Sequence, residues 1–171
     1  MIKIIEGNLF DSNAQIIAHQ VNCQKKMGSG VAKQVKERYP HVFNAYEDFL
    51  KDCSKPPLGA VQIVPIDINQ YDTQTNTVKN YMPNAQYICN MFAQADYGYD
   101  GRMYTDLYAF QCCLWELKMW ACGERKLLPG GVIAMPWMIG CVRGGANWDK
   151  DIYPMIQKIL GNKCNIELWK L

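Results

Sequence analysis

The sequence predicts an α/β fold of three layers, in which helices cover both faces of a mixed, mostly parallel central sheet. Short apolar runs alternate with segments of helical period along most of the chain, a pattern typical of parallel sheets built from strand–helix–strand units. Two of the apolar runs are each followed by a glycine-rich turn and then by a helix. The chain has 171 residues, of which 49% are hydrophobic, so we expect one domain spanning residues 1–171.

Each expected element follows from a local pattern. Strands are predicted at short apolar runs, and helices where apolar residues recur at intervals of three and four. The predicted strands are residues 2–5, 16–21, 60–66, 87–92, 132–135 and 165–169, and the predicted helices are residues 31–39, 42–52, 106–122 and 147–160, the last capped by Asn147. The two opening strands follow each other without a helix, which predicts mixed pairing at one edge. Residues 67–84 are polar and fit either a hairpin excursion or a long loop.

The composition gives no sign of a surface for nucleic acid or for a membrane. The net charge is +2, so no strong electrostatic footprint for nucleic acid or a membrane surface is present. No apolar run is long enough to span a membrane, and no charged segment followed by a long apolar stretch marks a signal peptide. We therefore expect a cytoplasmic protein with no membrane partner, and we predict a monomer.

The eight cysteines form no C-x-x-C pair and no metal-ligand spacing with His19 or His41, so no metal site is predicted. Without an export signal, reduced thiols are expected, several of them as small core residues inside apolar runs. Cys141 differs because it lies in a glycine-rich loop, where a thiol could act as a nucleophile. No base at a fixed spacing supports that role.

The first glycine-rich segment, residues 16–39, is the most informative part of the chain. It reads as an apolar strand, a polar turn, a glycine bend and a helix, with His19, Gln20 and Asn22 at the carboxyl end of the strand. Ligands of open α/β sheets bind outside the carboxyl ends of the strands. Residues 28–30, Gly-Ser-Gly, bring backbone N–H groups to the positive end of the following helix. The segment therefore predicts a site for a phosphate-bearing small molecule.

That prediction has a structural alternative, because G-x-G before a helix by itself more often reflects turn chemistry than a phosphate cradle. The segment lacks the dinucleotide fingerprint, since Lys33 stands where the third glycine would be, and no Walker sequence occurs. A second segment, residues 132–148, favours the cradle. It repeats the order strand, glycine loop, helix, with Arg143 in the loop. Backbone amides and a charge-assisted bond from Arg143 could then hold a diphosphate.

These segments resemble the macro domain, the ADP-ribose-binding module. IKIIEGNLF resembles its opening strand and adenine-side turn, with Asn8 where an Asp is usual. IIAHQVNCQKKMGSGVA resembles its first glycine-loop stretch, and IGCVRGGANW its second diphosphate loop. NMFAQADYGYDGRMYTDLYAF resembles the stretch after the central strand in phage and bacterial members. The resemblance covers nearly the whole chain, and for a phage-encoded member it places the protein in the host-cell cytoplasm.

The resemblance implies a set of contacts with ADP-ribose or its 1″-phosphate and requires no cofactor. Asn22 falls where the family's Asn meets the distal ribose, and residues 27–31 fall on the loop around the distal ribose and phosphate. His19 replaces an Asn that is usual in many members. The residues expected to bind the ligand are Asn8, Leu9, Asn22, Met27, Gly28, Ser29, Gly30, Val31, Gly140, Cys141, Val142, Arg143, Gly144, Gly145 and Ala146.

Within the family, the His-x-x-Asn form and the MPxxxxG tract are most similar to one branch. That branch holds the ADP-ribose 1″-phosphate phosphatases and the terminal ADP-ribose glutamate hydrolases. The glutamate hydrolases use a Lys and an Asp, and Gln94 and Gly144 stand at those places in this chain, which argues against a lysine adduct. Val142 stands where a Gly is common, which raises the question of whether the loop keeps its backbone angles.

His19 is the expected catalytic residue, because an imidazole with a near-neutral pKa suits proton transfer. Asp96, Asp100 and Asp149 are candidate carboxylate partners, and the alternative for His19 is a satisfied structural histidine. Two classes of function stay open. The first is an enzyme, most of all a phosphatase acting on ADP-ribose 1″-phosphate, or else a hydrolase removing ADP-ribose from modified protein or nucleic acid. The second is a non-catalytic reader of ADP-ribose.

Overall fold

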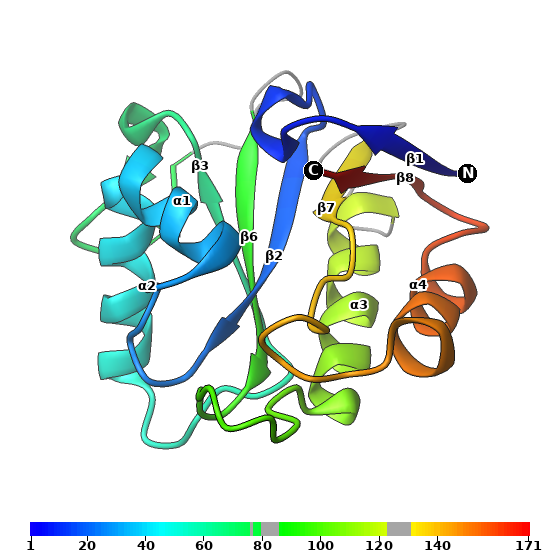
Figure 1. The fold of residues 1–171 in the computed structure, drawn as a ribbon. Helices are drawn as coiled ribbons and strands as arrows, with labels where there is room; N and C mark the ends of the chain where they lie inside the picture. The colour runs from blue at the N-terminus through cyan, green and yellow to red at the C-terminus, as the bar shows by residue number, and fades with distance from the viewer. Residues whose placement is uncertain (76, 80–85, 123–130) are drawn as a thin grey trace.

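A computed structural model describes residues 1–75, 77–79, 86–122 and 131–171, apart from the side chain of Cys122. Its centre is a six-stranded sheet with the strand order β1–β8–β7–β2–β6–β3 (Figure 1). The strands are β1 (Ile2–Glu6), β2 (Ile16–Asn22), β3 (Val61–Pro65), β6 (Tyr87–Gln94), β7 (Val132–Pro136) and β8 (Asn165–Lys170). All neighbours run parallel except β3, which is antiparallel to β6. The predicted mixed, mostly parallel sheet is confirmed.

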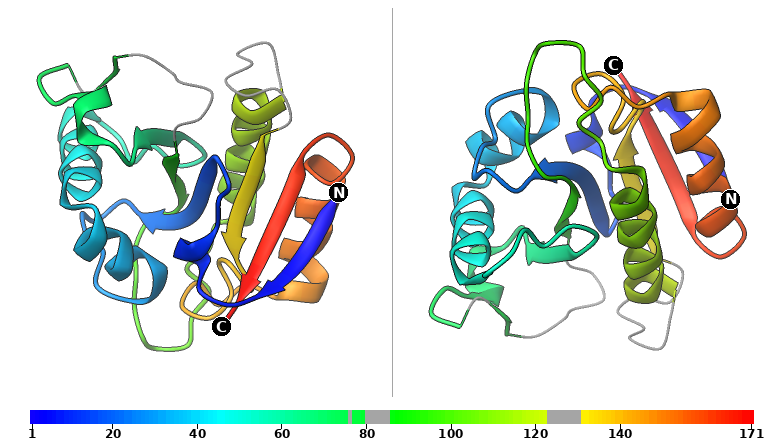
Figure 2. Two further views of the ribbon diagram at one scale, coloured as in Figure 1. Left: turned by 90° about the horizontal axis from the view of Figure 1, so that it is seen from above. Right: turned by 90° about the horizontal axis from the view of Figure 1, so that it is seen from below.

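Helices cover both faces of this sheet, as predicted. They are α1 (Gly30–Arg38), α2 (Pro40–Asp52), α3 (Leu107–Cys122), a π-helical turn (Trp148–Ile152) and α4 (Tyr153–Ile159). The first two pack on one face, and α3 and α4 pack on the other (Figures 1 and 2). β2 and β6 lie between the two apolar cores, which is why both strands are almost completely buried.

Local predictions for the helices also hold. Asn147 caps the π-helical turn before α4, since its Oδ1 accepts a hydrogen bond from the Lys150 N–H at 2.9 Å. On α3, Phe110, Leu114 and Leu117 are fully buried, as expected for apolar residues that recur at helical intervals within the predicted helix 106–122. Among the described helices, none has the length and apolar character needed to cross a bilayer.

The antiparallel pairing lies at a different edge from the one expected. β1 pairs in parallel with β8 and is not adjacent to β2, so the prediction of mixed pairing at the opening strands is wrong. The antiparallel strand is β3. Two helices, α1 and α2, connect β2 to β3. A single crossover helix returns the chain for a parallel strand, whereas a second helix reverses it again, so β3 runs back alongside β6.

Between β3 and β6 the chain forms a small hairpin. Its elements are the 3₁₀ turn η2 (Ile68–Gln70), β4 (Tyr71–Asp72) and β5 (Thr77–Val78). β4 and β5 pair antiparallel, which confirms the hairpin interpretation for this part of residues 67–84. Residues 76 and 80–85 of that stretch lie outside the described residues.

The expectation of reduced thiols is wrong at one position. Cys164, which is buried just before β8, is disulfide-bonded. The free cysteines among the described side chains are Cys23, Cys53, Cys89, Cys112, Cys113 and Cys141. Of these, Cys89 and Cys113 are buried, in agreement with the prediction of small core residues. Cys141, which the sequence set apart from them, is buried as well.

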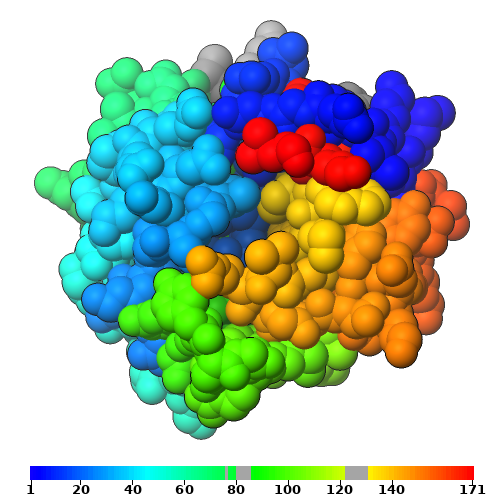
Figure 3. All heavy atoms as spheres, viewed as in Figure 1, coloured from blue at the N-terminus to red at the C-terminus, as the bar shows by residue number. Residues whose placement is uncertain are grey.

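The carboxyl ends of β2, β6 and β7 lie at the same end of the sheet (Figure 1). A loop follows each strand: the first glycine loop (residues 23–29), the tyrosine loop (residues 95–106) and the second glycine loop (residues 137–147). Figure 3 shows a hollow on this face between α1 and the second glycine loop. The fold therefore brings together both glycine segments singled out in the sequence.

Candidate ligand-binding site

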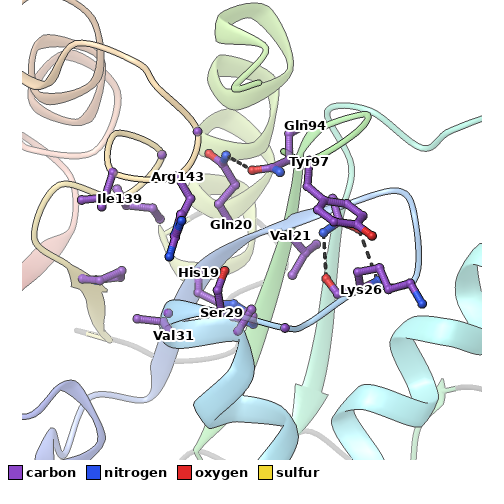
Figure 4. Close-up of a pocket in the computed structure, with 18 of the residues that line it drawn as sticks. His19, Gln20, Val21, Lys26, Ser29, Val31, Gln94, Tyr97, Ile139 and Arg143 are labelled. Atoms are coloured by element: carbon purple, nitrogen blue, oxygen red, sulfur yellow. Dashed lines mark hydrogen bonds between the residues drawn. The ribbon is translucent and has the colours of Figure 1, made fainter. Parts of the chain in front are cut away.

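A cavity of about 620 Å³ lies between the three loops, beyond the carboxyl ends of β2, β6 and β7 (Figure 4). This is where open α/β sheets bind ligands, and the volume lies in the range of small-molecule sites. Residues from both glycine loops, the tyrosine loop, β2 and the first turn of α1 line it. The predicted site residues that line it are His19, Asn22, Gly28, Ser29, Gly30, Val31, Gly140, Val142, Arg143 and Gly144.

The first glycine loop and the start of α1 present bare backbone to this cavity. A Cβ atom built on Gly28 or Gly30 meets nothing within 4 Å, so the space beside both residues is open. Gly30 has a φ of +56°, a left-handed conformation that other residues adopt at a cost. The side chain of Ser29, the N-cap of α1, makes no capping hydrogen bond. This geometry has room for the anion cradle predicted from the sequence, and the binding of an anion there stays a prediction.

Asn22 holds the shape of the turn that leads into this loop. Its Oδ1 accepts hydrogen bonds from the Gln24 N–H at 2.9 Å and the Tyr46 hydroxyl at 3.0 Å. Its Nδ2 donates to the Lys26 carbonyl at 2.7 Å. The amide expected to meet a ribose is therefore already engaged within the protein, and its contact with a ligand stays a prediction.

The second glycine loop closes the opposite side of the cavity. Gly140 and Gly145 adopt φ angles of +75° and +73°. Gly144 has no room for a side chain, because a Cβ there would lie 2.0 Å from Thr105 Oγ1 and 2.3 Å from the Gly140 carbonyl oxygen. A carboxylate at position 144 would therefore displace Thr105. Val142 is not among the described residues with positive φ, so its backbone accommodates a valine.

The rim of the cavity is positively charged and aromatic. Arg143 points into the cavity in Figure 4, and its guanidinium carbon lies 4.5 Å from the centre of the Tyr99 ring. Tyr97 and Lys26 also line the cavity. Of the residues that the structure describes, no Asp or Glu lines it. The site therefore favours an anionic ligand.

A network of side-chain amides ties two of the loops to the end of β2. Gln20 Nε2 donates to Gln94 Oε1 at 2.6 Å and to Thr105 Oγ1 at 2.8 Å (Figure 4 shows the first bond). Thr105 donates in turn to the Gly140 carbonyl at 2.7 Å, and Gln94 Nε2 donates to the Asp96 carbonyl at 2.8 Å. Both ends of the Gln94 amide are thus used inside the protein. Gln94 is structural at the position where the resemblance would have placed a reactive lysine.

His19 faces the cavity from the end of β2 and is only 1% exposed. Its Nε2 lies 2.7 Å from Asn90 Oδ1, and no described atom forms a hydrogen bond with its Nδ1. Burial lowers the pKa of His19 from 6.5 to about 4, an effect that the Asn90 bond only partly offsets. The folded protein thus moves the pKa of His19 away from the near-neutral intrinsic value that suggested proton transfer, and the ring is neutral at physiological pH.

None of the three carboxylates considered as partners of His19 forms that contact. Asp96 accepts a hydrogen bond from the next backbone N–H, and Asp100 pairs with an arginine of its own loop at 2.6 Å. Asp149 is exposed in the turn before α4. The partner is the amide Asn90, which stands opposite His19 on the neighbouring strand. Because this amide is uncharged, burial is the dominant influence on the pKa of the His19 ring.

Because His19 is buried in its neutral form, we predict that the free energy of unfolding falls in acid. Its pKa is about 4 in the folded protein against an ordinary 6.5. Between these values the unfolded chain binds a proton that the folded chain does not, so stability falls as the pH falls through this window. The full loss is about 3 kcal/mol. Urea denaturation of the wild type should show this loss of unfolding free energy between pH 6.5 and 4. The loss over the same pH range should be smaller in His19→Gln.

His41→Gln is the matched control for this experiment, because the chain has 2 histidines. This variant should keep the wild-type pH dependence. Equal pH dependence in wild type and His19→Gln would contradict the neutral burial of His19.

Several predicted contacts lie outside the cavity lining. Asn8 caps the 3₁₀ turn η1 (Leu9–Asp11) by accepting a hydrogen bond from the Phe10 N–H at 3.0 Å. Gly145 lies in the second glycine loop, where its N–H donates to the Cys141 carbonyl. The remaining members are buried in the apolar cores, and these are Leu9, Met27, Cys141 and Ala146. Their contact with a ligand stays a prediction.

The chemistry of Cys141 argues against a nucleophilic role. Burial raises the pKa of its thiol to about 11, and two nearby aspartates raise it further in the same direction. The thiol is therefore protonated near neutral pH, whereas the thiolate is the nucleophile. In the described part of the chain, no group of three His, Cys, Asp or Glu side chains is placed to hold a metal ion.

Sequence reasoning missed part of the lining. Gln20 was placed at the strand end but not among the ligand-binding residues, and the other lining residues outside that set are Val21, Lys26, Ala32, Gln94, Tyr97, Gly98, Tyr99, Pro136, Trp137, Met138 and Ile139. A signal existed for the tyrosine loop, because it follows a strand whose carboxyl end lies at the same edge of the sheet as the other two loops. No signal existed for Met138, a non-glycine residue that adopts a φ of +58°.

Curated relatives share segments of this sequence. A DNA ADP-ribosyl glycohydrolase of Thermus aquaticus is 27% identical over 99% of this chain and 40% of its own length. An ADP-ribose 1″-phosphate phosphatase of Aspergillus oryzae is 32% identical over 46% of this chain and 39% of its own length. An uncharacterized 17.5 kDa protein of Enterobacteria phage T4 is 28% identical over 87% of this chain and 84% of its length. The chain thus matches two fifths or less of the glycohydrolase and the phosphatase.

Solved structures resemble the whole chain. The macrodomain of Mycobacterium tuberculosis DarG superposes with a TM-score of 0.71 at 22% identity, covering 99% of this chain and 97% of that one. Thermosipho africanus DarTG in complex with ADP-ribose gives a TM-score of 0.73 at 16% identity, covering 99% of this chain and 41% of that one. No protein-family profile matches the chain. The chain therefore has the macrodomain fold.

Proposed function

We propose that this protein binds ADP-ribose and hydrolyses a derivative of it, with ADP-ribose 1″-phosphate as the favoured substrate and inorganic phosphate as the product. The observation that carries the proposal is the pairing of two open glycine positions, Gly28 and Gly30, with Arg143 across one cavity. Backbone N–H groups at a helix N-terminus and a guanidinium are suited to a diphosphate.

The charges of the cavity support an anionic ligand held mainly by backbone. Lys26 and Arg143 are the charged residues among the described lining. The cradle at Gly28–Gly30 needs no side chain, so its affinity depends on the loop keeping its shape. The bonds of Asn22 within the turn maintain that shape.

The names of the relatives support hydrolysis of an ADP-ribose derivative, since they include a phosphatase acting on ADP-ribose 1″-phosphate and a DNA ADP-ribosyl glycohydrolase. A lysine adduct is not part of the proposal. Gln94 and Gly144 stand where that route would need a lysine and an aspartate, and Gly144 has no space for a carboxylate. The proposed hydrolysis therefore uses water as the nucleophile.

Binding itself gives the first test. We expect ADP-ribose to bind with a Kd in the micromolar range, about −8 kcal/mol, as measured by isothermal calorimetry. AMP should bind more weakly because it leaves the distal ribose and one phosphate position empty. No heat and no competition at millimolar ADP-ribose would refute the proposal.

A second candidate function is removal of ADP-ribose from nucleic acid. The specific observation is the rim, where Tyr97 and Tyr99 are 41% and 69% exposed and Arg143 stacks on the Tyr99 ring. Exposed rings at the mouth of a positive cavity suit stacking of a base. Turnover assays on ADP-ribose 1″-phosphate, ADP-ribosylated DNA and ADP-ribosylated protein separate these activities. Binding without turnover on any of them would leave a reader of ADP-ribose.

A further inference from the structure

A row of buried side chains crosses three strands beside the cavity. His19 on β2 stands opposite Asn90 on β6, and Asn90 stands opposite Gln62 on β3. Their exposed fractions are 1%, 0% and 8%. Of the three, His19 alone lines the cavity. The row ends on α2, where Gln62 Nε2 donates to the Ala45 carbonyl at 2.9 Å.

This last bond fixes the direction of all the others. A carbonyl oxygen only accepts, so Gln62 turns its NH₂ group to Ala45 and its Oε1 to Asn90. Asn90 Nδ2 therefore donates to Gln62 Oε1 at 3.0 Å, and Asn90 Oδ1 faces His19. Because Oδ1 only accepts, the Nε2 of His19, 2.7 Å away, carries the hydrogen.

The other ring nitrogen is then a bare acceptor. In the neutral ring with hydrogen on Nε2, Nδ1 holds a lone pair, and no described protein atom donates to it. A buried acceptor without a partner is costly, so the site gains from an occupant that brings a hydrogen to this point. A sugar hydroxyl does so, whereas an ionised phosphate oxygen carries no hydrogen and would be repelled by the lone pair.

We propose that Asn90 and Gln62 are positioning residues that hold His19 in its Nε2–H tautomer, and that Nδ1 accepts a hydrogen bond from a sugar hydroxyl of the ligand. The second part rests on the proposed function, because ADP-ribose would supply the hydroxyl. The first part concerns the protein alone. The two parts of the proposal assign different roles to two regions of the cavity: His19 recognises a hydroxyl group, and the two glycine loops hold phosphate.

Nitrogen NMR of protein labelled with ¹⁵N-histidine tests the first part without ligand, because the two tautomers give different ring shifts. We expect His19 to be Nε2–H at pH 7. In Gln62→Leu the Asn90 amide is free to turn and donate to His19 Nε2, so the Nδ1–H form should become populated. Val64→Ala is the matched control, since Val64 is buried on the same face of the same strand and its loss removes packing alone.

His41 supplies an internal reference in every sample. Its Nε2 lies 2.9 Å from the Pro65 carbonyl oxygen, which only accepts, so its Nε2–H form should persist throughout. A protonated or Nδ1–H His19 in the wild type would overturn the positioning role. So would an unchanged His19 tautomer in folded Gln62→Leu, or in Gln62→Met should the leucine variant not fold.

Ligand titration tests the second part. ADP-ribose should move the His19 Nδ1 resonance while Nε2 keeps its hydrogen, and Gln62→Leu should bind ADP-ribose roughly fivefold to tenfold more weakly. Inorganic pyrophosphate, which has no sugar hydroxyl, should bind both proteins equally. Bound ADP-ribose with an unmoved Nδ1 resonance would overturn the hydroxyl contact. No binding of ADP-ribose to the wild type would refute the proposed function and leave the tautomer result standing.

Discussion

Gly30→Glu should abolish ADP-ribose binding while the protein stays folded. Gly30 lies at the start of α1, where a Cβ meets nothing within 4 Å, so the new side chain would occupy the space in which backbone approaches phosphate. Its carboxylate would also repel the anionic ligand, and it would cancel the positive potential at the helix N-terminus that attracts the ligand. We expect a loss of more than about 100-fold in affinity, equivalent to roughly 2.7 kcal/mol or more, measured by calorimetry.

Gly101→Glu is a matched control for this variant. Gly101 has a φ of +79°, and a Cβ there also meets nothing within 4 Å, so the backbone penalty and the added charge are the same. Gly101 does not line the cavity, and the control should retain most of the wild-type affinity. Unchanged affinity in a folded Gly30→Glu protein would show that this loop is not the phosphate cradle.

The residues that could be identified from sequence are those whose role is set locally. Glycines after an apolar run marked both loops, because few other residues allow positive φ or a close approach of backbone to a ligand. The cap at Asn147 and the inward face of α3 were likewise readable, since each depends on residues within a turn or two.

The features that could not be predicted depend on contacts between distant segments. The His19–Asn90 and Asn90–Gln62 bonds join residues 71 and 28 positions apart, and no local pattern shows which side chains will face each other across strands. The depressed pKa of His19 follows from the burial that this packing produces. The direction of β3 likewise depends on the connection from β2, which contains two helices; a connection with one helix would have made β3 a parallel strand.

Asn22 illustrates a different limit. Its place in the first glycine segment suggested a ligand contact, and the structure adds hydrogen bonds to the turn and to Tyr46. An Asn that shapes a loop and an Asn that meets a ribose give the same sequence signal. Only coordinates separate the two roles, and only a ligand experiment shows whether both apply.

Replacing His19 should separate an enzyme from a reader. For a phosphatase, His19→Ala should lower turnover of ADP-ribose 1″-phosphate by roughly 100-fold or more, the usual effect of losing a general base or acid. The structure narrows that role to a base that acts through the bound sugar hydroxyl, because the ring is neutral near pH 7 and Nδ1 holds a lone pair. The hydroxyl that donates to Nδ1 can in turn accept a hydrogen bond from the attacking water. ADP-ribose affinity should fall by less than about tenfold, since one hydrogen bond is worth about 1 kcal/mol.

The pH profile and a second pair of variants complete this test. With a pKa of about 4, His19 stays available as a base down to that pH, so its titration should cause no fall in turnover near pH 6.5. The side-chain amide of His19→Gln can still donate a hydrogen bond to Asn90, so this variant replaces His19→Ala in the assay if the alanine variant does not fold.

Asn22→Ala should show the reverse pattern, with weaker ADP-ribose binding and a lower free energy of unfolding, because the hydrogen bonds of Asn22 shape the loop. Full activity in His19→Ala would remove His19 from the mechanism, and an inactive wild type would leave the reader.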